Sequence, residues 1–245
     1  MSLSIAHKRA VKDLQLLDRN REELNSRGIH WHFDPENIMS GSFLVIPRHK
    51  CDLEDKELES PYTGGMFLFK VQIPSDYPLT PPEVKFYPQQ NVCRLHPNYY
   101  QNGKVCLSSI NTWGTPDWCP SMSLMSLANT LEERLNERSL SCEPGHERET
   151  NAKLKEFNKI VAYGVSQVAV CDVLERRRPE YEPFYEVIGK VWDKQAYLEL
   201  AKKNAQTFPR PVRVRQQTYS HEITIDWGVA VARLERAIKR FGDGT

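Results

Sequence analysis

The chain has 245 residues, with 33 Lys and Arg against 32 Asp and Glu, so its formal net charge is +1. This balance argues against the strongly basic field on which nucleic-acid-binding proteins usually depend. Hydrophobic residues make up 40% of the chain and charged residues 27%, as in a soluble globular protein with one large domain or a domain with an extension. We therefore expect no nucleic-acid partner.

No stretch approaches the ~18 consecutive apolar residues of a membrane span. The first seventeen residues lack the apolar core and the cleavage site of a secretory signal. We therefore expect a cytoplasmic protein with no membrane partner, and the nucleus stays open as a second compartment. In a reducing compartment the six cysteines are expected to be thiols. None forms a CxxC pair and no histidines stand at zinc-site spacing, so we expect no metal.

The N-terminal part predicts a helix followed by short strands. Apolar residues recur at helical spacing over residues 5–25, and charged residues form the other face. The apolar residues are Ala10, Leu14, Leu17 and Leu24, and the charged ones are Lys8, Arg9, Lys12, Asp13, Arg19 and Glu22. Three or four strand-like runs follow, at residues 28–33, 42–48, 65–73 and 83–87. Their connections are too short for crossover helices, so an antiparallel meander is expected. The acidic segment 51–60 is expected to be an exposed loop.

The rest of the chain predicts a rigid turn, a long loop and helices. The proline-dense segment 74–82 fixes several φ angles and indicates a rigid elbow. Residues 88–120 have little periodicity, and a loop of that length is usually functional. Helices are expected from about Ser121, over residues 148–174, and around 181–205 and 226–241. The stretch FPRPVRVRQQ, residues 208–217, is expected to separate the last two.

Four short motifs stand in order along the chain. Tyr62–Phe67 reads Y-x-G-G-x-F, and Tyr77–Pro82 reads Y-P-x-x-P-P. His96-Pro97-Asn98 is followed eight residues after Asn98 by Cys106, and Trp118-Cys119-Pro120 comes next. Together these motifs resemble the ubiquitin-conjugating enzymes. The resemblance implies an α+β fold with an N-terminal helix, a four-stranded antiparallel meander sheet, an active-site loop and C-terminal helices.

Further segments resemble the larger, C-terminally extended branch of that family, which includes the type Z enzyme. They are GTW…PDWCP, EPGHE and VAVCDVLE, the last at residues 168–175. We therefore expect a conjugating core over residues 1–175 and a helical extension over 176–245 packed on it. Aromatic residues in the extension are expected to pack its helices.

The resemblance implies that Cys106 carries ubiquitin or a ubiquitin-like modifier as a thioester. A thiolate is a strong nucleophile, and exchanging sulfur for sulfur needs no strong base. We expect Cys106 in an exposed loop; the alternative is a small buried apolar residue. Asn98 is the candidate oxyanion stabiliser, because a side-chain N–H can stabilise charge on the attacked carbonyl. Asn98 could instead, or in addition, tie the loop backbone.

A lysine that attacks the thioester must lose a proton, and an acidic gate residue can help. Glu143 is our candidate for that gate. The alignment leaves Cys142 as an alternative, Asp117 is a second acidic group near in sequence, and Glu143 could also be a solvated charge. His96 is expected to be structural, because no orienting carboxylate stands beside it in the sequence.

The resemblance also implies partners: the modifier, an activating enzyme that uses ATP upstream, and a ubiquitin ligase. No cofactor is expected on this chain. The positions that match the family's ligase-binding residues are Leu79, Pro120, Ser121, Lys8, Arg9 and Lys12. Ser121 departs from the family's alanine and Cys119 from its serine, while Tyr99 replaces an aliphatic residue. For the cations, an ordinary solvated helix face is the alternative.

Three rival interpretations stay open at this point. The first is a non-covalent modifier-binding scaffold on the same fold. The second is a cysteine hydrolase that uses Cys106 and His96. In the third, the extension 176–245 blocks the site, and its deletion would speed charging. The sequence does not identify the modifier, the ligase, the substrates, the chain linkage or the oligomeric state.

Overall fold

The computed structural model describes residues 4–48, 58–87 and 92–243. The chain divides into two compact units. The first comprises Met1–Pro47, Phe67–Gln89 and Asn98–Leu135, and the second Arg48–Met66, Gln90–Pro97 and Asn136–Thr245. Residue 175, the predicted boundary between core and extension, falls inside the second unit. Most of the predicted acidic loop, residues 51–57, lies outside the described residues.

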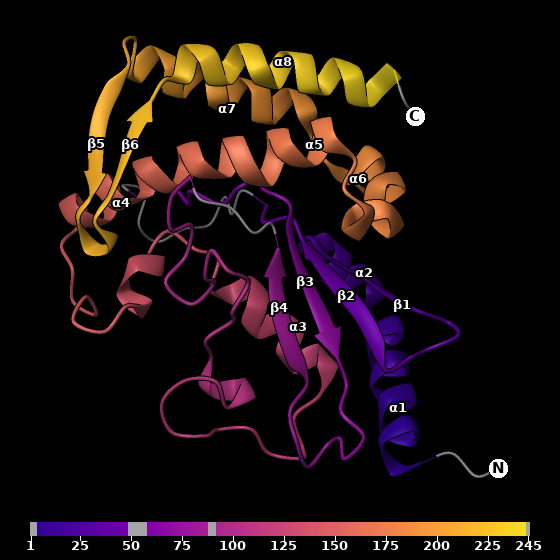
Figure 1. The fold of residues 1–245 in the computed structure, drawn as a ribbon. Helices are drawn as coiled ribbons and strands as arrows, with labels where there is room; N and C mark the ends of the chain where they lie inside the picture. The colour runs from indigo at the N-terminus through magenta and orange to yellow at the C-terminus, as the bar shows by residue number, and fades with distance from the viewer. Residues whose placement is uncertain (1–3, 49–57, 88–91, 244–245) are drawn as a thin grey trace. The chain divides into compact units, whose positions relative to one another are not determined.

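The first unit contains the predicted sheet. Its strands are β1 (Ile29–Phe33), β2 (Ser40–Val45), β3 (Phe67–Gln72) and β4 (Glu83–Tyr87). They pair antiparallel in the order β1-β2-β3-β4, which confirms the meander (Figure 1). The register sets Phe43 opposite Phe69, and Phe69 opposite Phe86, all buried. This row of aromatic side chains follows from the period-two pattern of strands.

Three α-helices and a short 3₁₀ helix (Ser108–Ile110) complete this unit within the described residues. The predicted helix 5–25 is interrupted at Asn20, so it forms α1 (Ile5–Arg19) and α2 (Arg21–Ser26). The apolar run after residue 121 forms α3 (Leu124–Glu133), which begins with a capping box between Ser123 and Ser126. Helix α1 packs on α3, α2 contacts β1, and α3 contacts β2. The core of this unit lies between these helices and the sheet.

The second unit is built around one long helical rod. The predicted helix 148–174 is α4 (Asn151–Gly164), a π-helical segment (Val165–Cys171) and α5 (Asp172–Arg176). Helix α8 (Trp227–Asp243) packs on α5, on the π-helical segment and on α7 (Lys194–Thr207). Figure 1 shows α7 and α8 lying along this rod. Two short 3₁₀ segments, Ser139–Cys142 and Pro179–Phe184, and α6 (Tyr185–Val191) complete its helices within the described residues.

The extension also contains a β-hairpin that the sequence analysis did not predict. The stretch expected to separate two helices forms β5 (Val212–Gln216), a 3₁₀ turn (Gln217–Tyr219) and β6 (His221–Ile225). The two strands pair antiparallel from Val212↔Ile225 to Gln216↔His221. Both strands contact α4, and Ile225 is buried. The extension is therefore mixed rather than helical throughout.

Candidate active site

Cys106 lies in the long loop after β4. The loop is fastened by backbone bridges, Lys85 to Lys104 and Tyr99 to Val105. Gly103 adopts φ +89°, a conformation that glycine reaches without a Cβ clash, and its carbonyl accepts a hydrogen bond from the Phe86 N–H at 2.8 Å. The loop thus continues the edge of the sheet and holds Cys106 in a defined place.

The thiol of Cys106 is buried, contrary to the expectation of an exposed loop: the residue is 3% exposed. Its Sγ lies 3.4 Å from the carbonyl oxygen of Thr112. The turn from Leu107 to Thr112 brings that carbonyl over the sulfur, because the Thr112 hydroxyl and the Leu107 backbone are hydrogen-bonded at 2.9 and 3.1 Å. Spacing alone placed the cysteine in the loop but could not show that the loop folds back on it.

Asn98 is bonded to the residue that carries the thiol. The Cys106 N–H donates to the Asn98 carbonyl at 2.9 Å, and the Asn98 side-chain Nδ2 donates to the Cys106 carbonyl at 2.9 Å. Asn98 is 9% exposed. The side chain therefore ties the loop, as one of its two interpretations predicted, and the same contact holds an amide donor beside the nucleophile.

The elbow and the loop before α3 are joined in the first unit. Trp118 donates its indole N–H to the carbonyl of Pro78 at 2.8 Å, and its ring lies 5.9 Å from that of Tyr77. Two of the four motifs thus form one surface. Leu79 is 73% exposed there, and Pro120 and Ser121 are exposed as well.

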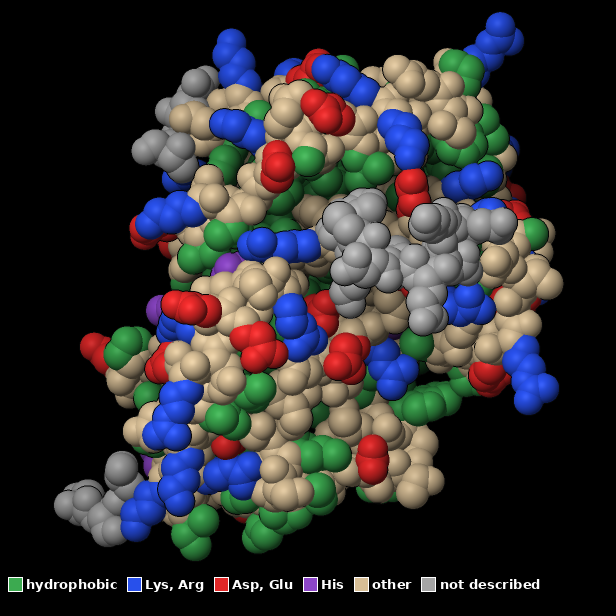
Figure 2. All heavy atoms as spheres, turned by 180° about the vertical axis from the view of Figure 1, so that it is seen from behind, with side chains coloured by type: hydrophobic (Ala, Val, Ile, Leu, Met, Phe, Trp, Pro, Cys, Tyr) green, Lys and Arg blue, Asp and Glu red, His purple; other side chains and the backbone are tan. Residues whose placement is uncertain are grey.

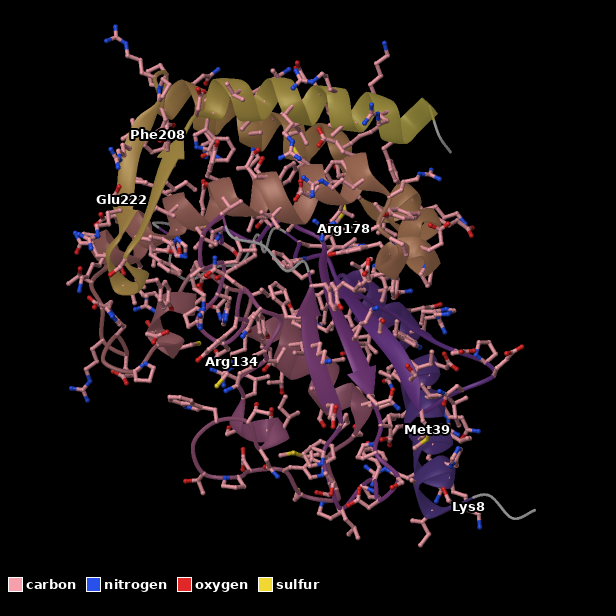
Figure 3. The ribbon with its side chains drawn as sticks, viewed as in Figure 1. Lys8, Met39, Arg134, Arg178, Phe208 and Glu222 are labelled. Carbon is pink, nitrogen blue, oxygen red and sulfur yellow. The ribbon has the colours of Figure 1, made fainter. Side chains whose placement is uncertain are left out.

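The charged groups of α1 divide into exposed and bound ones. Lys8 and Lys12 are exposed, and Lys8 lies near the N-terminal end of α1 (Figure 3). Figure 2 shows Lys and Arg side chains gathered near the N-terminal end of the chain, with hydrophobic side chains beside them. Ile5, which the sequence analysis did not single out, is 80% exposed. Of the predicted ligase-binding residues on α1, Lys8 and Lys12 are therefore accessible to solvent.

Arg9 does more than present a charge. Its guanidinium donates to the carbonyls of Pro120, at 2.6 Å, and Met122, and to the Asp13 carboxylate at 2.9 Å. Asp13 is only 4% exposed and also accepts from the buried Tyr77 hydroxyl. Its assignment to the charged face of the helix was therefore wrong. The signal was present, because the buried residues of α1 are Ala6, Ala10, Asp13 and Leu17, which share one helical face.

Glu143 and His96 belong to the second unit. Glu143 is half-buried, and its carboxylate accepts a hydrogen bond from the Tyr219 hydroxyl at 2.7 Å. It is therefore held by a partner and is not simply a solvated charge. His96 is fully buried, with its ring 5.7 Å from that of Tyr62, which agrees with the structural role expected for it.

The other described cysteines differ in reactivity. Burial raises the pKa of Cys93 and of Cys171 to about 12, so both thiols stay protonated at neutral pH. Cys119 is exposed and lies 2.9 Å from the Ser121 hydroxyl, which lowers its pKa. An accessible thiol is therefore present beside Ser121, one of the predicted ligase-binding residues.

Two further properties concern the described residues only. No group of three or more His, Cys, Asp or Glu side chains in residues 4–48, 58–87 and 92–243 is arranged to hold a metal ion. In the same ranges no helix has both the length and the apolar character needed to cross a membrane.

Comparison with known proteins points to one family. Residues 28–164 match the family model described as "Ubiquitin-conjugating enzyme". The chain is 40% identical over 134 residues to "Ubiquitin-conjugating enzyme E2 Z" of Homo sapiens, which covers 54% of this chain and 38% of that protein. With the Danio rerio protein of the same name the identity is 39% over 156 residues, covering 61% and 48%.

The chain spans about 38 to 54% of the length of the type Z relatives that it matches. Among solved structures, a ubiquitin conjugating enzyme E2 from Plasmodium falciparum aligns at 25% identity with a TM-score of 0.42, covering 56% of this chain and 87% of that chain. The family assignment accordingly rests on the sequence match, which includes both Asn98 and Cys106. The predicted resemblance to the type Z branch is confirmed by these relatives.

Proposed function

The chain belongs to the ubiquitin-conjugating enzyme family, and on that premise we propose that Cys106 accepts ubiquitin or a ubiquitin-like modifier from an activating enzyme and passes it to a substrate lysine. The observation that carries the proposal is the Asn98–Cys106 pair. A nucleophile and an amide donor are held together by two hydrogen bonds at 2.9 Å. This is the pairing that acyl transfer through a thioester needs.

In the first step the Cys106 thiolate attacks the thioester carbonyl of the modifier on the activating enzyme. A new bond forms between the carbonyl carbon and the Cys106 sulfur, and the thiolate of the activating enzyme leaves. In the second step a lysine amine attacks the Cys106 thioester and the carbonyl oxygen becomes negatively charged. Asn98 donates to that oxygen, the Cys106 thiolate leaves, and the nitrogen loses its proton to give an amide.

The buried thiol sets one requirement for this chemistry. The contact between Cys106 and the Thr112 carbonyl, 3.4 Å long, covers the sulfur and has to open before an acyl group can bond to it. Thr112 itself is exposed, whereas Leu107 and Ile110 of the same turn are buried, so only the exposed end of the turn has to move to uncover the sulfur. We expect binding of the activating enzyme to stabilise this open arrangement.

The partners follow from the same premise. The exposed Leu79, Pro120, Ser121 and Lys8 would contact a ubiquitin ligase, while Arg9 supports that surface from within. Energy enters through ATP on the activating enzyme, so the chain itself would need no cofactor. A cytoplasmic or nuclear location would fit these partners, which act in a reducing environment where the thiol persists.

The decisive experiment is a charging assay with ATP, ubiquitin or a related modifier, and a panel of activating enzymes. Wild type is compared with Cys106→Ser and Cys106→Ala. We expect an adduct on the wild type that a reducing agent cleaves, an oxyester that resists the reducing agent on the serine variant, and no adduct on the alanine variant. An adduct that persists on Cys106→Ala would contradict the proposed role of this cysteine.

A second candidate is the non-covalent modifier-binding scaffold, which the 3% exposure of Cys106 favours. It predicts binding of the free modifier but no adduct with any activating enzyme. Cleavage of modifier esters without an activating enzyme would instead indicate the hydrolase that uses Cys106 and His96. The charging assay, a binding assay with the free modifier and an ester-cleavage assay together separate the three functions.

Asn98 gives a second, quantitative prediction. If it stabilises the oxyanion, Asn98→Ala should slow discharge of the thioester to free lysine about 10²- to 10³-fold. The matched control is Asn111→Ala, because the Asn111 side chain also ties a loop, accepting from the Asp117 and Trp118 N–H groups at 3.0 Å. Equal and small losses in both variants would leave Asn98 with a loop-tying role alone.

A further inference from the structure

The tip of the β5–β6 hairpin carries two residues with contacts to Glu143, the predicted gate, and to Arg94, which stands just before the His96-Pro97-Asn98 motif. Gln216 ends β5 and is 2% exposed, and Tyr219 follows it three residues later at the end of the connecting turn. Ser220, at φ +54°, then reverses the chain into β6. The hairpin is seated on α4, where the ring of Phe157 meets that of Tyr219 edge-on at 6.4 Å.

Gln216 is hydrogen-bonded to the backbone that leads into the His96-Pro97-Asn98 motif. Its side-chain oxygen accepts from the Arg94 N–H at 3.0 Å, and its side-chain nitrogen donates to the Arg94 carbonyl at 2.9 Å. The guanidinium of Arg94 donates in turn to the carbonyls of His96, at 3.0 Å, and Pro97, at 2.8 Å. The last of these carbonyls belongs to the peptide bond that joins Pro97 to Asn98.

Tyr219 is hydrogen-bonded to the side chain of Glu143. Its hydroxyl donates to the Glu143 carboxylate at 2.7 Å, and its ring lies 5.0 Å below the Arg94 guanidinium. Burial first, and then the neighbouring Glu143, raise the pKa of Tyr219 well above its ordinary value. The hydroxyl therefore stays protonated and remains a donor at neutral pH. A hydrogen bond from a half-buried hydroxyl to a charged acceptor is among the stronger ones in proteins.

We propose that the β5–β6 hairpin is a positioning element for the transfer step: Gln216 fixes the segment that ends at Asn98, and Tyr219 fixes the acidic group Glu143. This inference rests on the proposed function and goes beyond it by giving the extension a part in transfer to the amine. Gln216 reaches the segment before Asn98 through Arg94, and Tyr219 reaches Glu143 directly, so one displacement of the hairpin tip would disturb both. The extension then supports the site, which is the opposite of the blocking role that the sequence left open.

The test measures the rate at which the full chain discharges its thioester to free lysine. Each rate is expressed relative to the fraction of that variant that carries the modifier at the start. Tyr219→Phe removes only the hydroxyl, and Gln216→Met removes the two hydrogen bonds at similar side-chain volume. We expect each to slow discharge about tenfold, the loss that corresponds to about 1.4 kcal/mol. Charging by the activating enzyme should fall far less, because sulfur-to-sulfur exchange does not use Glu143.

Two controls separate positioning from general damage. Tyr185→Phe removes another buried hydroxyl of the second unit, one that donates to the carbonyls of Arg178 and Val173 at 3.3 and 3.4 Å. Glu222→Ala removes an exposed ion pair with Arg213 on the hairpin itself (Figure 3). Both variants should discharge at the wild-type rate.

The decisive readout is a double-mutant cycle. If Tyr219 acts through Glu143, then Tyr219→Phe should have no further effect on discharge in a Glu143→Ala background. An equal loss in both backgrounds, or wild-type discharge in Tyr219→Phe and Gln216→Met, overturns the inference while leaving the proposed function standing. Absence of any adduct on the wild type overturns the proposed function, and the inference with it.

Discussion

Substitution of Asp13 in α1 should destabilise the first unit far more than substitution of an acidic residue on a helix surface usually does. The Asp13 carboxylate accepts hydrogen bonds from the Arg9 guanidinium at 2.9 Å, from the Leu124 N–H at 3.3 Å and from the Tyr77 hydroxyl. Asp13→Ala removes all three acceptor contacts at once. It thereby removes the hydrogen bonds that Asp13 makes to the elbow and to the first residue of α3, while Arg9 keeps its bonds to the carbonyls of Pro120 and Met122.

The expected loss of unfolding free energy depends on which of the three donors stay buried without an acceptor. Tyr77 is fully buried, so its hydroxyl cannot turn to water, and an unsatisfied buried donor costs about 1–3 kcal/mol. The side chain of Arg9 is 21% exposed and can recover part of its hydration. Breaking a buried pair by removing one partner typically costs about 3–5 kcal/mol, and we expect Asp13→Ala to fall in that range. In a chain of this size that lowers the unfolding midpoint by about 6–20 °C.

Thermal unfolding followed by circular dichroism measures this loss. Asp18→Ala is the matched control, because Asp18 lies on the same helix as Asp13 but its ion pair with Arg21 of α2 is half exposed, and the substitution should cost less than about 0.5 kcal/mol. Adding Tyr77→Phe to Asp13→Ala should cost little, since the hydroxyl has already lost its acceptor. Equal midpoints for Asp13→Ala and Asp18→Ala would refute the reasoning.

Two other predictions test local geometry. Gly64→Ala should destabilise by at least about 2 kcal/mol, because Gly64 has φ +74° and a new Cβ would lie 2.5 Å from the Tyr197 ring; Gly114→Ala, at φ +60° with open space, should cost only about 1 kcal/mol in the same unfolding assay. Cys119 should be alkylated more slowly in Ser121→Ala, because the lost hydrogen bond lets its pKa rise; an unchanged rate by mass spectrometry would contradict that cause.

The sheet could be predicted because its information is local. The alternation in residues 65–73 and the short connections determine an antiparallel meander, and the four strands lie within three residues of the predicted ranges. Helix boundaries were less certain: nothing local showed that α1 ends at Arg19 or that a π-helical segment lies inside residues 148–174. The candidate nucleophile could be predicted for the same reason, because the motif that contains Cys106 and Asn98 spans only a short segment in which the two are eight residues apart.

The β5–β6 hairpin escaped prediction although a weak signal existed. Val212 and Val214 alternate with Arg213 and Arg215, which is the period of a strand. The run is short and follows two prolines, and Val212 is 40% exposed, so the pattern does not resemble a buried strand. Its partner strand and its seat on α4 are tertiary contacts, which override weak local preferences.

The partner of Glu143 could not be predicted for the same reason: Tyr219 lies 76 residues away along the chain. Nothing in the residues around Glu143 indicates which hydroxyl will reach it. The burial of Cys106 under the Thr112 carbonyl could not be predicted either, because motif spacing gives the order of residues along the chain and not their exposure to solvent.

This distribution of contacts decides which experiments on the extension are informative. Deleting residues 176–245 would remove Gln216 and Tyr219, but it would also remove α8, whose Trp227, Ala230 and Leu234 are buried. It would further break the bonds of Arg233 to Asp172, at 2.6 Å, and to Glu175, at 2.7 Å. The deletion exposes the apolar surface of α5, so a slower enzyme would not distinguish a lost positioning element from an unfolded second unit. Faster charging by the deleted chain, in contrast, could not arise from damage, and it would favour the blocking role over the positioning one.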